Sequence, residues 1–168
     1  GVIMLQLLDD LEKLHRTGWV LGDLKTENLL VVSDPIRIRW VDVGGTTKMG
    51  RAIKEYTEFF DRGYWGLGTR KADASYDLFA LAMVIVNLAY PNRFAKTDNP
   101  RQLIYKKIDR AQILKPYETF LKRAVSGTYR TSLEMRQDIL QKFQNQSMFP
   151  NRHSHIHIEP FYRTPIFI

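Results

Sequence analysis

The pattern of hydrophobic and polar positions predicts a chain made mostly of helices. Apolar residues recur every three or four positions across residues 2–17, and Gly18 is a typical C-terminal cap. Residues 75–89 are apolar almost all round, which predicts a central buried helix. Their longest apolar run, 78–86, is about half the length that crosses a bilayer, so we expect no membrane span.

Three amphipathic helices are expected after the central one, at residues 99–110, 116–127 and 131–143. Asparagine followed by proline is the usual start of a helix and begins the first of them. Thr131 and Glu134 have the spacing of a capping box, which begins the last.

The pattern changes beyond Gln144, where the chain is aromatic, interrupted by proline and without a helical period. We therefore expect a helical lobe at residues 1–144 and an extension at 145–168. Its alternating histidines are candidate metal ligands, but no acidic or thiol partners accompany them, so a polar extension is the simpler interpretation. These histidines are His153, His155 and His157.

One region predicts strands instead. Residues 28–32 and 36–41 are apolar and flank a turn-forming Ser-Asp-Pro, so we expect an antiparallel hairpin. A hairpin brings its outer ends together, and polar groups lie just before the first strand and just after the second. These groups are Asp23, Lys25, Asn28, Asp42 and Gly44.

Two carboxylates, an amide and an ammonium in one small volume are typical of a metal–phosphate site. In phosphoryl transfer the protein does little covalent work, so the placement of charge around the transition state supplies most of the rate. A hairpin with capping Asp and Asn side chains explains either polar cluster alone, but not both clusters in this order.

The spacing D-x-K-x-x-N followed by D-x-G resembles the catalytic loop and the metal-binding loop of the protein-kinase superfamily. The longer match DVGGTTK, at residues 42–48, is similar to bacterial Ser/Thr kinases of the eukaryotic (Hanks) type, including one associated with sporulation in bacilli. The resemblance covers residues 2–143 and is specific only at the two loops. It implies a mostly α fold (the helical part of an α+β family): the kinase C-terminal lobe, with helices around a central buried helix and a small hairpin.

The resemblance assigns a role to each polar group. Asp23 would accept the proton of the substrate hydroxyl, and Lys25 would steady the transferred phosphoryl group. Asn28 and Asp42 would hold Mg²⁺, and Gly44 would complete the nucleotide-binding loop. ATP and Mg²⁺ are therefore the expected cofactors, and a protein hydroxyl is the expected acceptor.

Asp77, at the start of the central helix, is a candidate supporting residue. A carboxylate in this position can be a simple helix cap. The resemblance implies more, namely that Asp77 accepts backbone N–H groups near Leu21 and Gly22 and so fixes Asp23. Leu21 and Gly22 replace the family's His-Arg pair, whose arginine binds a phosphate on the activation segment, here residues 45–74. We therefore expect no switching through that charge pair.

Two more supporting residues follow from the resemblance. Thr57 lies about where the family has the threonine that bridges the catalytic aspartate and lysine. Arg130 stands where an arginine pairs with the glutamate of an Ala-Pro-Glu signature. That signature is absent from this sequence. Glu58 and Asp61 are therefore the candidate partners of Arg130, and the alternative is that Arg130 is an unpaired surface residue.

The net charge of +7 is concentrated in one part of the chain. Residues 93–152 contain 13 Lys/Arg and 5 Asp/Glu, whereas the preceding part is almost neutral. Such a region suits nucleic acid or another polyanion, and equally a solvated face of ordinary surface helices. The chain has no cysteine, so no disulfide framework is expected, and a cytoplasmic location fits, with any membrane anchor of the full-length protein outside this sequence.

Three functions remain open from the sequence: a Ser/Thr protein kinase, a small-molecule phosphotransferase of the aminoglycoside or choline type, and a pseudokinase or basic interaction module. Lys25 argues against the second, because that branch usually has another residue there. The resemblance places residue 2 inside the fold, without an N-terminal lobe. We therefore expect the isolated chain to be inactive, and either to self-associate or to cover its apolar surface with residues 149–168.

Overall fold

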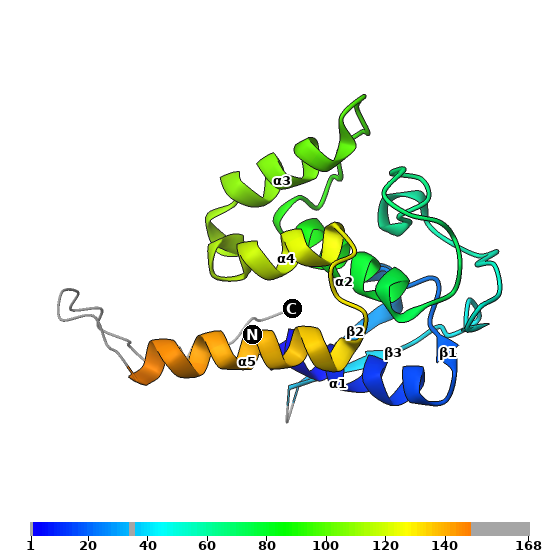
Figure 1. The fold of residues 1–168 in the computed structure, drawn as a ribbon, viewed down its shortest axis with the longest axis horizontal. Helices are drawn as coiled ribbons and strands as arrows, with labels where there is room; N and C mark the ends of the chain where they lie inside the picture. Colours follow the sequence, from blue (N-terminus) through cyan, green and yellow to red (C-terminus); the bar gives the residue numbers. More distant parts are fainter. Residues whose placement is uncertain (1, 34–35, 149–168) are drawn as a thin grey trace, which may run out of the picture.

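The computed structural model describes residues 2–33 and 36–148, and within them it is mostly helical, as predicted (Figure 1). Two sheets of two strands each accompany the helices in these residues. The α-helices are α1 Val2–Arg16, α2 Ala74–Ala89, α3 Pro100–Arg110, α4 Glu118–Val125 and α5 Ser132–Met148. The strands are β1 Trp19–Val20, β2 Leu29–Val32, β3 Arg37–Trp40 and β4 Thr47–Lys48, and the 3-10 helices are η1 Thr26–Asn28, η2 Glu58–Phe60 and η3 Gln112–Tyr117.

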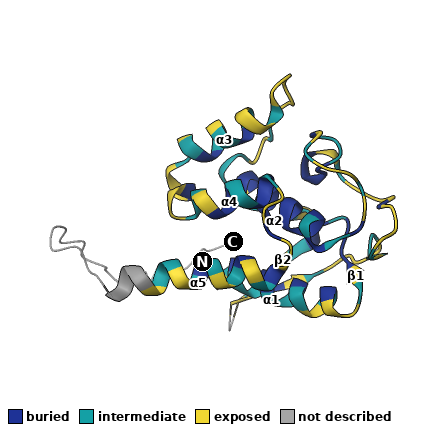
Figure 2. Cartoon of the chain, viewed as in Figure 1, coloured by how far each residue is buried: buried dark blue, intermediate teal, exposed yellow. Residues whose placement is uncertain are grey.

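Helix α2 is the centre of the fold, which confirms the prediction of a buried central helix. Twelve of its 16 residues are buried, and Figure 2 shows it as the most continuously buried element. Helix α4, helix α5 and the 3-10 helices η2 and η3 all contact it. Burial of a large apolar side chain contributes about 1.5–3 kcal/mol, so the apolar run of α2 explains why the lobe assembles around it.

Helix α1 packs along α5 and buries one apolar stripe. Gly18 follows the helix with a positive φ of 83°, and its N–H donates to the carbonyl of His15 at 2.9 Å. Glycine adopts this left-handed conformation without steric cost, which confirms the predicted cap. The chain then turns directly into β1.

The predicted hairpin is present as β2 and β3, paired antiparallel with Leu29 opposite Trp40. The pairing continues one step further, because the N–H of Val41 donates to the carbonyl of Asn28 at 3.1 Å. The outer ends of the hairpin, and the polar residues beside them, are therefore held together.

The structure differs from the predicted helix limits at two places. Pro116 lies in η3, and α4 begins only at Glu118, because proline removes the N–H that a continuous α-helix needs. Helix α5 continues to Met148, past Gln144, because no proline or glycine interrupts it before Pro150. The three histidines of the extension lie outside the described residues. No helix in the described part of the chain is long and apolar enough to cross a membrane.

The activation segment, residues 45–74, is mostly loop, and it is folded back on itself. Its strand β4 pairs with β1, and Ala52 forms a bridge with Lys71. The N–H of Ile53 donates to the carbonyl of Arg70 at 2.7 Å, which closes the two arms of the segment against each other.

Candidate active site

Asp77 joins helix α2 to the catalytic loop, residues 21–28. It is fully buried, and it accepts the N–H of Leu21 at 2.7 Å and the N–H of Gly22 at 3.0 Å. His15 Nε2 lies 2.9 Å from the same carboxylate, and its Nδ1 lies 3.0 Å from the hydroxyl of Ser132. Asp77 is not the cap of α2, because Asp73 has that position. Its carboxylate instead fixes the backbone just before Asp23.

Asp23 is held at both carboxylate oxygens. The ammonium of Lys25 donates to Oδ2 at 2.5 Å, and the hydroxyl of Thr57 donates to Oδ1 at 3.0 Å. The side-chain amide of Asn28 donates to the backbone carbonyl of Asp23 at 3.2 Å. The structure therefore brings four of the predicted site residues together, one of them from the activation segment.

Asn28 and Asp42 lie at the two outer ends of the hairpin. Asn28 uses its amide N–H₂ for the bond to the backbone, which leaves the amide oxygen available to a cation. One oxygen of Asp42 accepts the N–H of Gly44 at 2.8 Å, and the side chain is exposed.

This pair fits Mg²⁺, an ion usually held by one or two carboxylates together with water and substrate phosphates. The described residues contain no group of three or more His, Cys, Asp or Glu side chains that forms a closed metal cage. Two protein oxygens at an open surface suit a metal that arrives with phosphate.

Glycine is required at two places beside Asp23. Gly22 has a φ of 80°, and a Cβ on it would lie 2.5 Å from the carbonyl oxygen of Gly45. A Cβ on Gly45 would lie 2.9 Å from the Cβ of Asp23. The activation segment thus packs directly on the catalytic loop, and position 22 has no space for the arginine expected from the resemblance.

Apolar side chains are exposed on the hairpin beside the Asn28–Asp42 pair. Each is more than half exposed. They are Leu30, Val31, Val41 and Val43.

Asp61 is a second fully buried carboxylate, and it lies within the activation segment. It accepts the N–H groups of Gly63 at 2.9 Å and Tyr64 at 2.8 Å, the guanidinium of Arg70 at 2.7 Å and the hydroxyl of Tyr76 at 2.9 Å. Burial, and then the negative charge of Asp61, raises the pKa of Tyr76 well above its ordinary value. The phenol therefore stays a donor.

Of the alternatives for Arg130, the structure agrees with a surface residue and pairs it with neither Glu58 nor Asp61. Asp61 is already satisfied by Arg70, which lies only nine positions away, and Arg130 is exposed and bonds Glu134 through its backbone N–H at 2.8 Å. Glu58 is likewise exposed and makes no ion pair in the described chain. The long-range pair was unnecessary because a local arginine fills the site.

The sequence interpretation missed two buried polar residues. His15 lies four positions after Leu11, on the apolar stripe of α1. A polar side chain on a buried face needs a hydrogen-bond partner, so its position in the stripe was the available signal. Arg62 is 7% exposed and binds Asp73 at 2.9 Å and the hydroxyl of Ser75 at 2.6 Å. Burial opposes ionisation of Asp73, but the bonds from Arg62 and Ser75 outweigh it and lower its pKa.

Several cations of the basic region are engaged locally. Lys122 lies 2.5 Å from Asp109 and 2.8 Å from Glu118, and its bonds together with those of Lys115 lower the pKa of Glu118 to about 2. Arg123 pairs with Asp138. Local pairing accounts for part of the charge excess, and binding of a polyanion by this region stays a prediction.

These features agree with the comparison to known families. Residues 1–152 match the family model described as the protein kinase domain. The chain therefore belongs to the protein kinase family, and its fold is the mostly helical part of that domain.

A relative and a solved structure support this. The serine/threonine-protein kinase YabT of Bacillus subtilis (strain 168) is 52% identical over 139 residues, which are 83% of this chain and 41% of that protein. The chain thus spans about two fifths of the curated relative. The kinase PK-1 of the Cydia pomonella granulovirus has a similar fold, with a TM-score of 0.59 at 22% identity over 80% of this chain and 55% of that chain.

Proposed function

We propose that this chain is the catalytic-lobe portion of an ATP-dependent Ser/Thr protein kinase. The observation that carries the proposal is the position of Asp23, bound by Lys25 and Thr57 beside the Asn28–Asp42 pair. The 52% identity to a serine/threonine-protein kinase supports the reaction and the type of acceptor.

Each residue has a part in such a transfer. Asp23 orients the acceptor hydroxyl and takes its proton as the phosphoryl group leaves ATP. Lys25 is held by its hydrogen bond to Asp23. Its ammonium therefore lies beside the transferred phosphoryl group and stabilises the negative charge of the transition state. Thr57 prevents rotation of the Asp23 carboxylate. Asn28 and Asp42 would hold Mg²⁺. When bound, the ion would neutralise part of the negative charge of the ATP phosphates.

The exposed apolar side chains of the hairpin suit the base of the nucleotide and the remaining part of the kinase. The chain spans 41% of its relative. We propose that a part of the full-length protein outside this chain packs over these exposed side chains. An uncovered site lacks the low dielectric in which fixed charges are effective, so we expect the isolated chain to be inactive and to bind ATP weakly.

The test uses the full-length protein with ATP, Mg²⁺ and a protein acceptor. We expect Asp42→Ala to lower the rate by about a thousandfold or more, because loss of a metal ligand costs several kcal/mol of transition-state stabilisation. Asp98→Ala removes an exposed carboxylate elsewhere and is the matched control. Thermal unfolding should show that both variants fold, and near-normal phosphorylation by a folded Asp42→Ala protein would contradict the proposal.

A further inference from the structure

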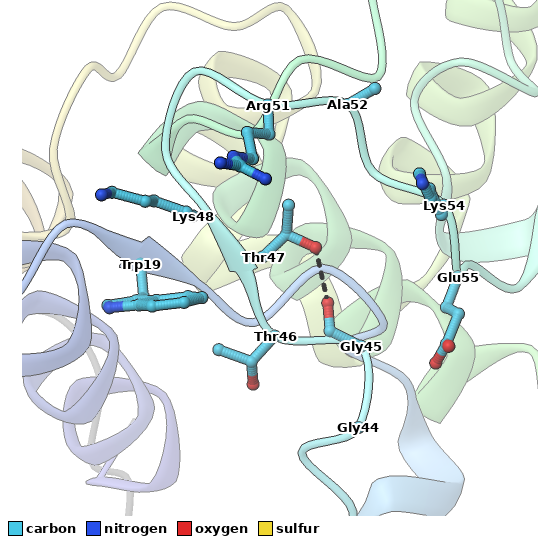
Figure 3. Close-up of a pocket in the computed structure, with 10 residues that line it drawn as sticks. All are labelled: Trp19, Gly44, Gly45, Thr46, Thr47, Lys48, Arg51, Ala52, Lys54 and Glu55. Atoms are coloured by element: carbon cyan, nitrogen blue, oxygen red, sulfur yellow. Dashed lines mark hydrogen bonds between the residues drawn. The ribbon is translucent and has the colours of Figure 1, made fainter.

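The catalytic loop has two parts, and different contacts hold them. The first part, around Asp23, is fixed by Asp77 and by the activation segment, where Gly45 lies against Asp23. The carbonyl of Gly45 in turn accepts the hydroxyl of Thr47 at 2.9 Å (Figure 3). The second part is the 3-10 helix η1, which ends at the predicted metal ligand Asn28. The contacts around Asp23 do not reach the start of η1.

Asn87, near the end of helix α2, binds η1 directly. The hydroxyl of Thr26, the first residue of η1, donates to the side-chain oxygen of Asn87 at 2.7 Å. The two residues are 61 positions apart, and Asn87 is only 6% exposed. Asp77 lies ten positions earlier in the same helix, which is about 15 Å along its axis. Helix α2 therefore holds the catalytic loop at two separate points.

The orientation of the Asn87 amide is determined by its other partners. Its N–H₂ group donates to the carbonyl of Tyr90 at 2.9 Å and lies 3.5 Å from the carbonyl of Pro91. Carbonyl oxygens only accept, so the N–H₂ group must face them and the amide oxygen must face Thr26. The hydroxyl of Thr26 is therefore the donor, and the amide is bound on both sides.

The turn after α2, residues 90–93, is itself fixed against η1. The N–H of Arg93 donates to the carbonyl of Tyr90 at 2.9 Å, and the Arg93 guanidinium pairs with Glu27, the middle residue of η1. Arg93 has a φ of 55°, which is the one positive φ at a non-glycine residue in the part of the chain that the structure describes. A residue keeps this unfavourable conformation only where its surroundings enforce it, and such residues are concentrated at functional sites.

We propose that Asn87 is a positioning residue for phosphoryl transfer, and that it acts through Thr26 on the two side chains beside η1. Lys25 directly precedes Thr26, and its ammonium must stay on Asp23. Asn28 ends η1, and its amide oxygen is the one available to Mg²⁺. A displacement of η1 by about 1 Å would move both groups, and misplacement of this size costs about a hundredfold in rate. This inference rests on the proposed kinase activity.

The bond between Thr26 and Asn87 matters more for position than for stability. A neutral hydrogen bond contributes little net stability, because the unfolded chain makes equivalent bonds to water. The lobe assembles around the apolar residues of α2, and Thr26 is only partly buried. Removal of its hydroxyl should therefore leave the fold intact and loosen η1.

The test compares Thr26→Val with Thr26→Ser in the full-length protein, supplied with ATP, Mg²⁺ and a protein acceptor. Valine keeps the shape of threonine without the hydroxyl, whereas serine keeps the hydroxyl. We expect Thr26→Val to lower kcat by roughly ten- to a hundredfold and to change KM for the acceptor by less than about twofold. Thr26→Ser should keep kcat within about threefold of the wild type. An unchanged kcat in Thr26→Val, or an equal loss in both variants, would overturn the proposal.

Asn87→Leu tests the other side of the same bond. It should lower kcat about as much as Thr26→Val does, and the double variant should fall no further, because both changes remove one interaction. Losses that multiply in the double variant would show that the two residues act independently, which contradicts the proposal.

Asn99→Ala is the matched control, since it removes another asparagine whose side chain binds a backbone N–H, at the start of α3. It should lower the midpoint of thermal unfolding by about 2–4 °C and leave kcat unchanged. A loss of kcat equal to that of Thr26→Val would identify general destabilisation as the cause and overturn the proposal.

Hydrogen exchange gives a second readout that does not depend on activity. In Thr26→Val the backbone N–H groups of η1 and of Leu29 should exchange at least about tenfold faster, while those of Leu21 and Gly22 keep their protection by Asp77. Unchanged protection of η1 would overturn the role of the bond. Absence of phosphoryl transfer by the wild type would instead contradict the proposed kinase function, and the catalytic role of Asn87 with it.

Discussion

Two buried carboxylates of this chain are satisfied in opposite ways. Asp77 accepts from Leu21, Gly22 and His15, which lie 55 to 62 positions away. Asp61 accepts only from groups 2 to 15 positions away, one of them the cation Arg70. Both are fully buried. The first joins distant elements of the lobe, and the second closes a single loop.

The difference shows what each carboxylate does for the fold. Two backbone N–H groups of the catalytic loop depend on Asp77, so that carboxylate sets the path of the chain into Asp23. Asp61 shapes the activation segment, and its ion partner Arg70 is 38% exposed and can reach water. Removal of either carboxylate leaves hydrogen-bond donors without an acceptor, but Asp77 supports three groups from distant elements, whereas the cation that Asp61 holds can be solvated by water.

The largest effect is expected for Asp77→Ala. The N–H groups of Leu21 and Gly22 and the ring of His15 would lose a buried acceptor, which should cost about 3–5 kcal/mol of unfolding free energy. Chemical denaturation of the full-length protein measures this, and hydrogen exchange should show a less protected catalytic loop. A loss below about 1 kcal/mol would mean that Asp77 does not anchor the loop.

A smaller loss is expected for Asp61→Asn, about 1–3 kcal/mol, because the amide oxygen keeps part of the local hydrogen bonding and Arg70 turns to solvent. Proteolysis should cut the activation segment of this variant faster, with helix α1 unaffected. If Asp61→Asn proved as damaging as Asp77→Ala, the distinction between local and long-range anchoring would be wrong.

Tyr76→Phe tests the Asp61 cluster through pH. The pKa of Tyr76 is raised in the folded chain, so its contribution to stability is complete below about pH 10, the unfolded value, and is lost as pH rises above it. The wild type should therefore lose up to about 1.4 kcal/mol per pH unit more than the variant in that range. Denaturation between pH 9 and 11 measures the difference, and parallel curves would contradict the raised pKa.

The smallest effect is expected for Arg130→Ala, within about 0.5 kcal/mol, because the side chain is exposed and the hydrogen bond to Glu134 is made by the backbone N–H. Arg70→Ala, which leaves Asp61 buried without a cation, is the informative comparison and should cost more. Thermal unfolding of both variants side by side decides this. Equal destabilisation would restore a structural role for Arg130.

The sequence predicted the central helix, the hairpin and the residues at its outer ends, since these depend on local rules. A helix that is apolar almost all round is expected in the core, and a two-strand hairpin with a short turn has its ends together whatever surrounds it. For the same reason the hairpin pattern alone predicts that Asp23, Lys25, Asn28 and Asp42 form one site. Thr57 and Asp77 came from family resemblance rather than from local pattern.

Only the tertiary structure decided which distant groups meet. His15 pairs with Asp77 and Ser132 across three separate helices or their ends, and Asp61 pairs with Arg70 rather than with the distant Arg130. Hydrophobic periodicity fixes which face of an element is buried but carries no information on which polar group lies opposite it. Buried polar groups must find partners, and packing determines which of several candidates is within hydrogen-bond distance.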